Sequence, residues 1–157
     1  MLGVAALPFV QEMEDNGVGI IELEFTGSSD LAEAKYEDLG PDGRSAARTS
    51  LLIDYAYLIA YGLFLAGACV AVADRARRAG RRRLAALGPP LAWGALAAAA
   101  CDAVENAALL LILDGHTGQP WPAISTSFAS VKFILAVAAS LYALCGWLVT
   151  LRQPAPA

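Results

Sequence analysis

The sequence predicts an all-α membrane protein with three transmembrane helices and an N-terminal extracytoplasmic segment that carries a short amphipathic helix. Hydrophobic residues make up 57% of the 157 residues and charged residues only 17%, against about 25% charged in an average soluble domain. The mean hydropathy is +0.52. Three long stretches are apolar nearly all round, whereas helices of a soluble bundle keep a polar stripe. This pattern excludes a disordered chain, a nucleic-acid-binding protein and a disulfide-stapled secreted domain.

Residues 1–50 form an acidic segment with ten acidic and three basic residues. Val18–Phe25 alternates and contains β-branched residues, which favours a short strand or extended segment. Ser28 or Ser29 can cap a helix that begins near Asp30 and ends at Gly40-Pro41. We expect this amphipathic helix to lie on the outer surface, and a second helix start after it to continue into the first span.

The predicted three-helix transmembrane bundle covers residues 51–151. A span of the bilayer core needs about 20 apolar residues. The first predicted span is 51–73, and the third is 124–151. Pro89 and Pro90 stand near the start of the second apolar stretch, so its span is placed at 91–113. Residues 152–157 form a short Pro/Ala tail.

A run of arginines between the first two spans sets the expected orientation. Its members are Arg75, Arg77, Arg78, Arg81, Arg82 and Arg83. A short basic loop stays in the cytoplasm, so the N-terminus is expected outside and the C-terminus inside. Arginine outnumbers lysine nine to two and alanine is abundant, which points to a bacterial protein of the inner membrane. The same arginines can bind anionic lipid headgroups.

The cysteines and the single histidine predict neither a metal site nor a cofactor. Cys69, Cys101 and Cys145 lie one in each predicted span, without a CxxC pair, so we expect free thiols. His116 is the only histidine and lies in a predicted outer loop. These residues are too few and too scattered for zinc, and haem would need an axial ligand inside the membrane.

Ionisable side chains inside the spans are the candidate functional residues. They are Asp54, Asp102, Glu105 and Lys132, with Asn106 beside them. Each charge costs about 2.5–3.5 kcal/mol at a helix centre and normally faces the bundle interior. The second-span residues follow at i, i+3 and i+4, on one helix face. At a rise of about 1.5 Å per residue, all four charges fall in the outer half of the bilayer.

The predicted polar cluster is completed by a salt bridge and two tyrosines. Lys132 paired with Glu105 or Asp102 would offset much of the desolvation cost. Tyr57 and Tyr61 follow Asp54 by three and seven positions, and they can donate to these carboxylates.

Three interpretations of the cluster remain open at this point. It can hold helices together, as polar residues do in membranes. It can form a proton, ion or substrate pathway. It can be an intramembrane catalytic site for a lipid or other apolar substrate, with Glu105 as general base and Lys132 binding an anionic headgroup.

The pattern Leu52-Ile53-Asp54-Tyr55, Asp102xxGlu105-Asn106, Gln119-Pro120-Trp121-Pro122 and Lys132-Phe133 resembles small bacterial polytopic membrane proteins. This resemblance implies the fold and no activity. Residues 102–106 with Lys132 are also similar in outline to bacterial diacylglycerol kinase. That family works on the cytoplasmic side and has further glutamates without counterparts here, so its activity is not carried over.

Three spans can hardly shield four charges from lipid, so we expect partners. The partners would be other membrane protein subunits or copies of the chain, and no nucleic acid. The expected function is an accessory or assembly subunit of a bacterial inner-membrane complex. The alternatives are a small oligomeric proton/ion-coupled transporter or channel, and an intramembrane enzyme. Of these three classes, an enzyme is the least expected.

Overall fold

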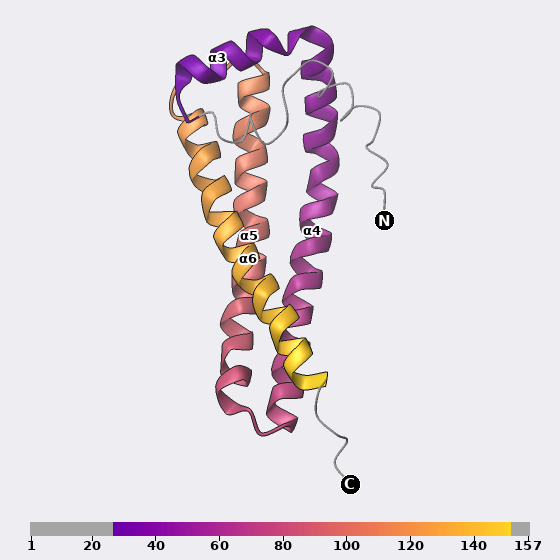
Figure 1. The fold of residues 1–157 in the computed structure, drawn as a ribbon. Helices are drawn as coiled ribbons and strands as arrows, with labels where there is room; N and C mark the ends of the chain where they lie inside the picture. The colour runs from indigo at the N-terminus through magenta and orange to yellow at the C-terminus, as the bar shows by residue number, and fades with distance from the viewer. Residues whose placement is uncertain (1–26, 152–157) are drawn as a thin grey trace. The chain divides into compact units, whose positions relative to one another are not determined.

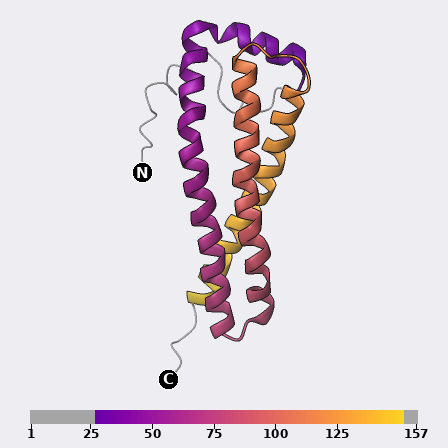
Figure 2. The ribbon, with the colours of Figure 1, turned by 180° about the vertical axis from the view of Figure 1, so that it is seen from behind.

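The computed structural model describes residues 27–151, where all regular secondary structure is α-helical. The helices are α3 (Ser29–Asp38), α4 (Gly40–Arg78), α5 (Arg82–Leu113) and α6 (Trp121–Leu151), seen from opposite sides in Figures 1 and 2. By length and composition, α4, α5 and α6 can each cross a membrane. An all-helical fold with three candidate spans is therefore confirmed. The predicted strand over residues 18–25 and the tail lie outside the described residues.

The helix expected near Asp30 is α3. Ser28 is its N-cap, and its hydroxyl accepts a hydrogen bond from the Leu31 N–H at 3.3 Å. Asp30 in the first turn complements the helix dipole. Gly40 has a φ of +60°, a left-handed conformation that ends one helix at little steric cost. Pro41 then lies in the first turn of α4, where its missing N–H is no loss.

Glycines also end α4 and α5. At the end of α4 the Arg81 N–H bonds the Ala76 carbonyl at 2.8 Å, and the Gly80 N–H bonds the Arg77 carbonyl at 3.0 Å. The same pair of bonds recurs at Gly115 after α5. Both glycines have positive φ, as this C-cap motif requires. The connection between α4 and α5 is consequently a tight turn.

The second predicted span is shorter than the helix that contains it. α5 begins at Arg82 and passes through Pro89 and Pro90, whereas the span was placed at 91–113. A proline removes the hydrogen bond to the carbonyl four residues earlier. A membrane helix tolerates this loss where neighbouring groups satisfy the freed backbone. The first and third spans are likewise parts of the longer helices α4 and α6.

The chain divides into two compact units, and α4, α5 and α6 each contribute to both. Among the described residues, the first unit consists of residues 27–57 together with Cys101–Ser130, and the second of Leu58–Ala100 together with residues 131–151. Each unit has its own hydrophobic core.

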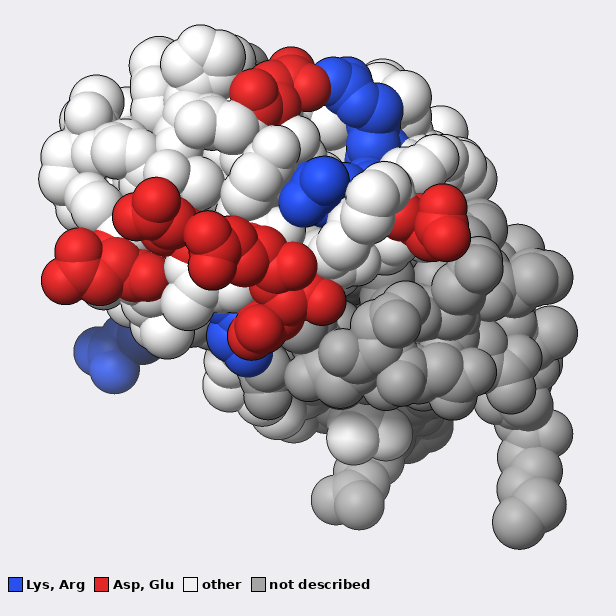
Figure 3. Space-filling view, turned by 90° about the horizontal axis from the view of Figure 1, so that it is seen from above, with Lys and Arg blue, Asp and Glu red and all other residues white. Residues whose placement is uncertain are grey.

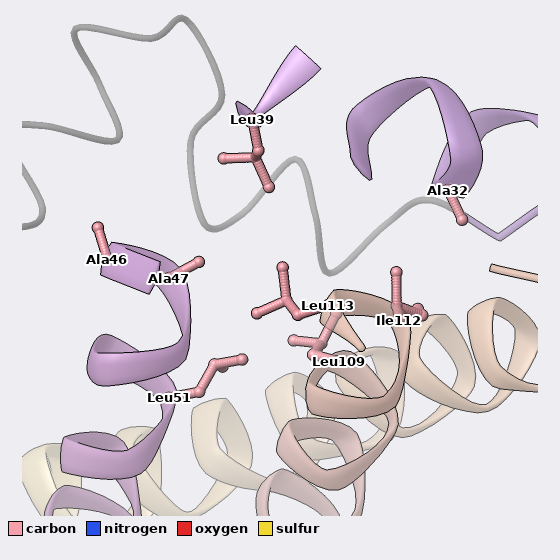
Figure 4. Packing of buried hydrophobic residues seen from close by; sticks show 8 residues of the cluster. All are labelled: Ala32, Leu39, Ala46, Ala47, Leu51, Leu109, Ile112 and Leu113. Carbon is pink, nitrogen blue, oxygen red and sulfur yellow. The ribbon is translucent and has the colours of Figure 1, made fainter. Parts of the chain in front are cut away.

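The core of the first unit joins α3, the start of α4 and the end of α5. Figure 4 shows this cluster of eight buried residues, in which Ala47 and Leu51 of α4 point toward Leu109 and Leu113 of α5. The eight residues are Ala32, Leu39, Ala46, Ala47, Leu51, Leu109, Ile112 and Leu113. The segment before α3 is tied to the start of α6, because the Gly27 N–H donates to Thr126 Oγ1 at 3.0 Å. The short helix α3 is therefore packed on the membrane-length helices through apolar contacts.

The second unit is packed through small residues. Its buried core consists of Cys69, Val72, Ala92, Ala95, Ala139 and Tyr142. A Cβ added at Gly62 would lie 2.7 Å from the Cβ of Ala99, so α4 and α5 approach each other at a distance that only glycine allows. Gly88 faces Ala73, and Gly146 faces Val72, with the same lack of room. Such small-residue contacts are typical of helices that associate in membranes.

Candidate functional site

Three neighbouring polar residues of α5 are buried in the first unit. Asp102, Glu105 and Asn106 share one face of the helix, and their relative exposures are 6%, 0% and 2%. Both side-chain oxygens of Glu105 are fully buried. Ser125 of α6, also in the first unit, is fully buried as well. The interior of this unit therefore contains polar side chains beside its apolar core.

Asp54 and Asn106 are brought together as a pair. Asn106 Nδ2 donates to Asp54 Oδ2 at 2.7 Å, and this bond joins α5 to α4. One turn lower on α5, the Ala103 carbonyl accepts a hydrogen bond from the Tyr55 hydroxyl at 3.1 Å. Two adjacent α4 residues thus hold the same stretch of α5, so these polar groups act as ties between helices.

Tyr55 was missed by the sequence prediction, which selected Tyr57 and Tyr61. Tyr57 is 65% exposed, and Tyr61 belongs to the second unit. Their predicted donation to the carboxylates stays a prediction. The sequence did contain a signal for Tyr55, because it shares a helix face with Leu51 and Leu58. The structure shows that both leucines are buried.

Lys132 lies on α6 in the second unit. Its side chain is largely buried at 8% exposure. Its Nζ lies 5.2 Å from the ring centroid of the neighbouring Phe133, within the range of a cation–π interaction. The predicted salt bridge between Lys132 and Glu105 or Asp102 stays a prediction.

The α3 end of the first unit carries exposed acidic residues and two arginines. Figure 3 shows a row of acidic side chains on this face, and α3 contributes four exposed acids, Asp30, Glu33, Glu37 and Asp38. Arg48 of α4 forms an ion pair with Asp114, just after α5. Arg44 donates to the Tyr36 carbonyl at 2.9 Å and lies over the Tyr36 ring. Both arginines therefore have local partners.

The predicted arginine loop is mostly helical. Arg75, Arg77 and Arg78 form the last turn of α4, and Arg82 and Arg83 begin α5, so only Arg81 lies in the connecting turn. Arg75 lies 4.4 Å from the ring centroid of Trp147 in α6, and Arg77 pairs with Asp74 at 3.2 Å. The C-cap motif at Gly80 makes the connection short. Most of the arginines therefore belong to the ends of the two helices and not to a loop.

Within residues 27–151, no group of three His, Cys, Asp or Glu side chains is placed to hold a metal ion. The three cysteines are free thiols, with Cys69 buried and Cys145 exposed. Comparisons with protein-family models, curated proteins and solved structures find no match for this chain. Function is therefore inferred from the contacts of its own side chains.

Proposed function

We propose that this protein is an accessory or assembly subunit of a membrane protein complex in the bacterial inner membrane. The observation that carries the proposal is the hydrogen bond from Asn106 to Asp54. The two side chains join α5 to α4, and an exposed carboxylate or amide on a lone helix would be costly in lipid. The polar residues thus serve helix association, which leaves the outer faces of the helices for partners.

Large apolar side chains cover those outer faces. Only 22% of the apolar, membrane-length stretch of α6 is buried within one copy of the chain. Ile134 and Leu144 on this helix are 70% and 64% exposed. Lipid or another membrane subunit can cover such a surface. We propose that a partner subunit covers part of it.

The proposed orientation places the N-terminus outside and the C-terminus in the cytoplasm. Six arginines lie in and around the turn between α4 and α5, and basic residues beside spans stay inside. At the opposite end, Arg44 and Arg48 are the basic residues of early α4, and both have local partners. These two basic residues therefore argue only weakly for the opposite orientation.

The proposal is tested on Asp102→Asn and Glu105→Gln in the full-length protein. Both changes keep side-chain shape and hydrogen-bonding capacity and remove titration. We expect each variant to co-purify in mild detergent with the same stoichiometric partners as the wild type, and to restore a deletion strain. Size-exclusion chromatography and growth are measured on the same variants. A wild-type protein that purifies without any stoichiometric partner contradicts the proposal.

The burial of Glu105 favours a second candidate, a small oligomeric proton/ion-coupled transporter or channel. Its carboxyl group is fully enclosed, and a protonatable group inside a membrane bundle is typical of proton relays. This candidate predicts a different outcome for Glu105→Gln, because an amide cannot carry the proton. Normal assembly combined with lost phenotype would support the transporter and contradict a purely structural role.

A further inference from the structure

An open groove lies between α4 and α5 in the second unit. It has a volume of about 440 Å³. On α4 its wall includes Leu63, Gly67 and Arg77, and on α5 it includes Pro89 and Trp93. The wall residues of each helix recur at helical spacing, so each helix presents one face. The groove is apolar along most of its length and has a guanidinium group at one end.

A second hollow of about 390 Å³ adjoins the arginine end. It shares Arg77 and Pro89 with the groove and adds Arg82, Ala85 and Ala86. Because Pro89 and Pro90 have no N–H, the carbonyls of Ala85 and Ala86 cannot accept the usual helix bond from four residues on. Two arginines give this end a positive charge that the rest of the groove lacks, beside an otherwise apolar lining.

Arg77 already contacts Asp74, with an Nη2–Oδ1 distance of 3.2 Å. Both side chains are about half exposed, at 60% and 49%, and exposed ion pairs contribute little. The carboxylate therefore does not prevent Arg77 from binding a second anion. Arg82 adds the second positive charge at the same hollow.

We propose that this groove binds one anionic glycerophospholipid, independently of any protein complex. The phosphate lies at Arg77 and Arg82, whose planar guanidinium groups match phosphate oxygens. One acyl chain follows the apolar wall toward Leu63. From Arg77 to Leu63 the helix rises about 21 Å, more than half of a hydrocarbon core of about 30 Å. A helix of a partner protein would have to bring its own acid to the two arginines.

The headgroup is tested with purified full-length protein in detergent. Apparent dissociation constants are measured by native mass spectrometry for phosphatidylglycerol and for phosphatidylcholine with the same acyl chains. We expect tighter binding of phosphatidylglycerol, and about tenfold or more weaker binding after Arg77→Gln with Arg82→Gln. The matched control is Arg78→Gln with Arg83→Gln, which removes the same charge from the same run outside both hollows. It should change the constant by less than about threefold.

The acyl chain is tested with Gly67→Leu, which fills the groove. A Cβ at Gly67 meets no atom within 4 Å, so the variant should keep the wild-type unfolding temperature in lipid-free detergent. We expect it to lose phosphatidylglycerol binding although both arginines remain. Glycerol 1-phosphate, which has the headgroup phosphate without chains, should not compete at equal concentration.

Four results would overturn the proposal. They are equal binding of the two lipids, an equal loss in the control pair, competition by glycerol 1-phosphate at the lipid's own concentration, or unchanged lipid binding in Gly67→Leu. A change of oligomeric state in Gly67→Leu without a change in lipid affinity would assign the groove to a partner helix instead.

Discussion

Asp54 and Asn106 illustrate how single polar residues act in the first unit. Their hydrogen bond of 2.7 Å lies in helices that are otherwise apolar. If α4 rotated about its axis, this hydrogen bond would break, and the loss of a hydrogen bond is costly in an apolar environment. The bond therefore specifies the rotational setting of α4 against α5 as well as contributing stability.

A double-mutant cycle tests this pair. Asp54→Ala and Asn106→Ala should each lower the free energy of unfolding by about 1–2 kcal/mol, because each removes the hydrogen bond between α4 and α5. The double variant should lose less than the two single losses combined, by about 1 kcal/mol. Unfolding is followed in mixed detergent micelles. The control is Leu52→Ala, an exposed residue of α4 in the same unit, which should change stability by less than about 0.5 kcal/mol. Additive losses at 54 and 106 would show that the bond does not stabilise the fold.

Some of these polar residues could be predicted from the sequence, and others could not. Asp54 and Asn106 stand out because polar groups are expensive inside an apolar stretch, so they were found. Tyr55 was not found, because tyrosine is common in such stretches and its partner is a backbone carbonyl. Because every residue has a backbone carbonyl, the residue types alone do not indicate that this hydrogen bond forms. The Glu105–Lys132 salt bridge remains a prediction of the same kind of reasoning.

At the scale of elements, the spans were predictable but the helix bounds were not. Apolar residues reveal where a helix lies in lipid, whereas backbone hydrogen bonds continue it into polar sequence at both ends. α4 thus begins eleven residues before the predicted span, at Gly40, and ends at Arg78. The break at Gly40-Pro41 was found from its residue types, because both residues have strong conformational preferences.

Swapping two small residues tests the contact between α4 and α5 in the second unit. Gly62→Ala should destabilise the protein by about 1–3 kcal/mol through overpacking, because Ala99 Cβ lies 2.7 Å from the added atom. Combining it with Ala99→Gly should recover most of the loss. The swap moves one methyl group across the interface and keeps the number of glycines in helices constant.

Gly67→Ala is the matched control for this swap. It is another glycine of α4, and an added Cβ there meets nothing within 4 Å, so its melting temperature should stay within a few degrees of the wild type. If Gly62→Ala proved equally harmless, or if the swap failed to restore stability, α4 and α5 would not be in close contact at this level.

For the whole molecule, the distribution of charge predicts orientation. We expect a cysteine at Gly118, which is exposed with open space around its Cα, to react with an impermeant maleimide in intact cells. A cysteine at Ala79, beside Gly80 in the arginine turn, should react only after permeabilisation. The native thiols Cys69, Cys101 and Cys145 are replaced by alanine in both variants. Labelling at position 79 in intact cells would reverse the proposed orientation.

The number of membrane-length helices could be predicted from the sequence, but their division into two compact units could not. Composition and apolar length predicted three membrane-length helices correctly, because the bilayer imposes those constraints on every span. The division into two compact units was not anticipated. It depends on which residues of different helices contact each other, and the apolar pattern of a single helix does not reveal those contacts.

The glycine contacts of the second unit have a consequence for how the protein opens. A hydrogen bond such as that of Asn106 can be exchanged for one to a penetrating water molecule, whereas the contacts at Gly62, Gly88 and Gly146 leave no room even for a Cβ atom. Local fluctuations should therefore begin in the first unit, and amide protons of residues 45–57 should exchange with deuterium sooner than those of residues 62–73. The first unit would then open locally more often than the second, although the same continuous helices run through both.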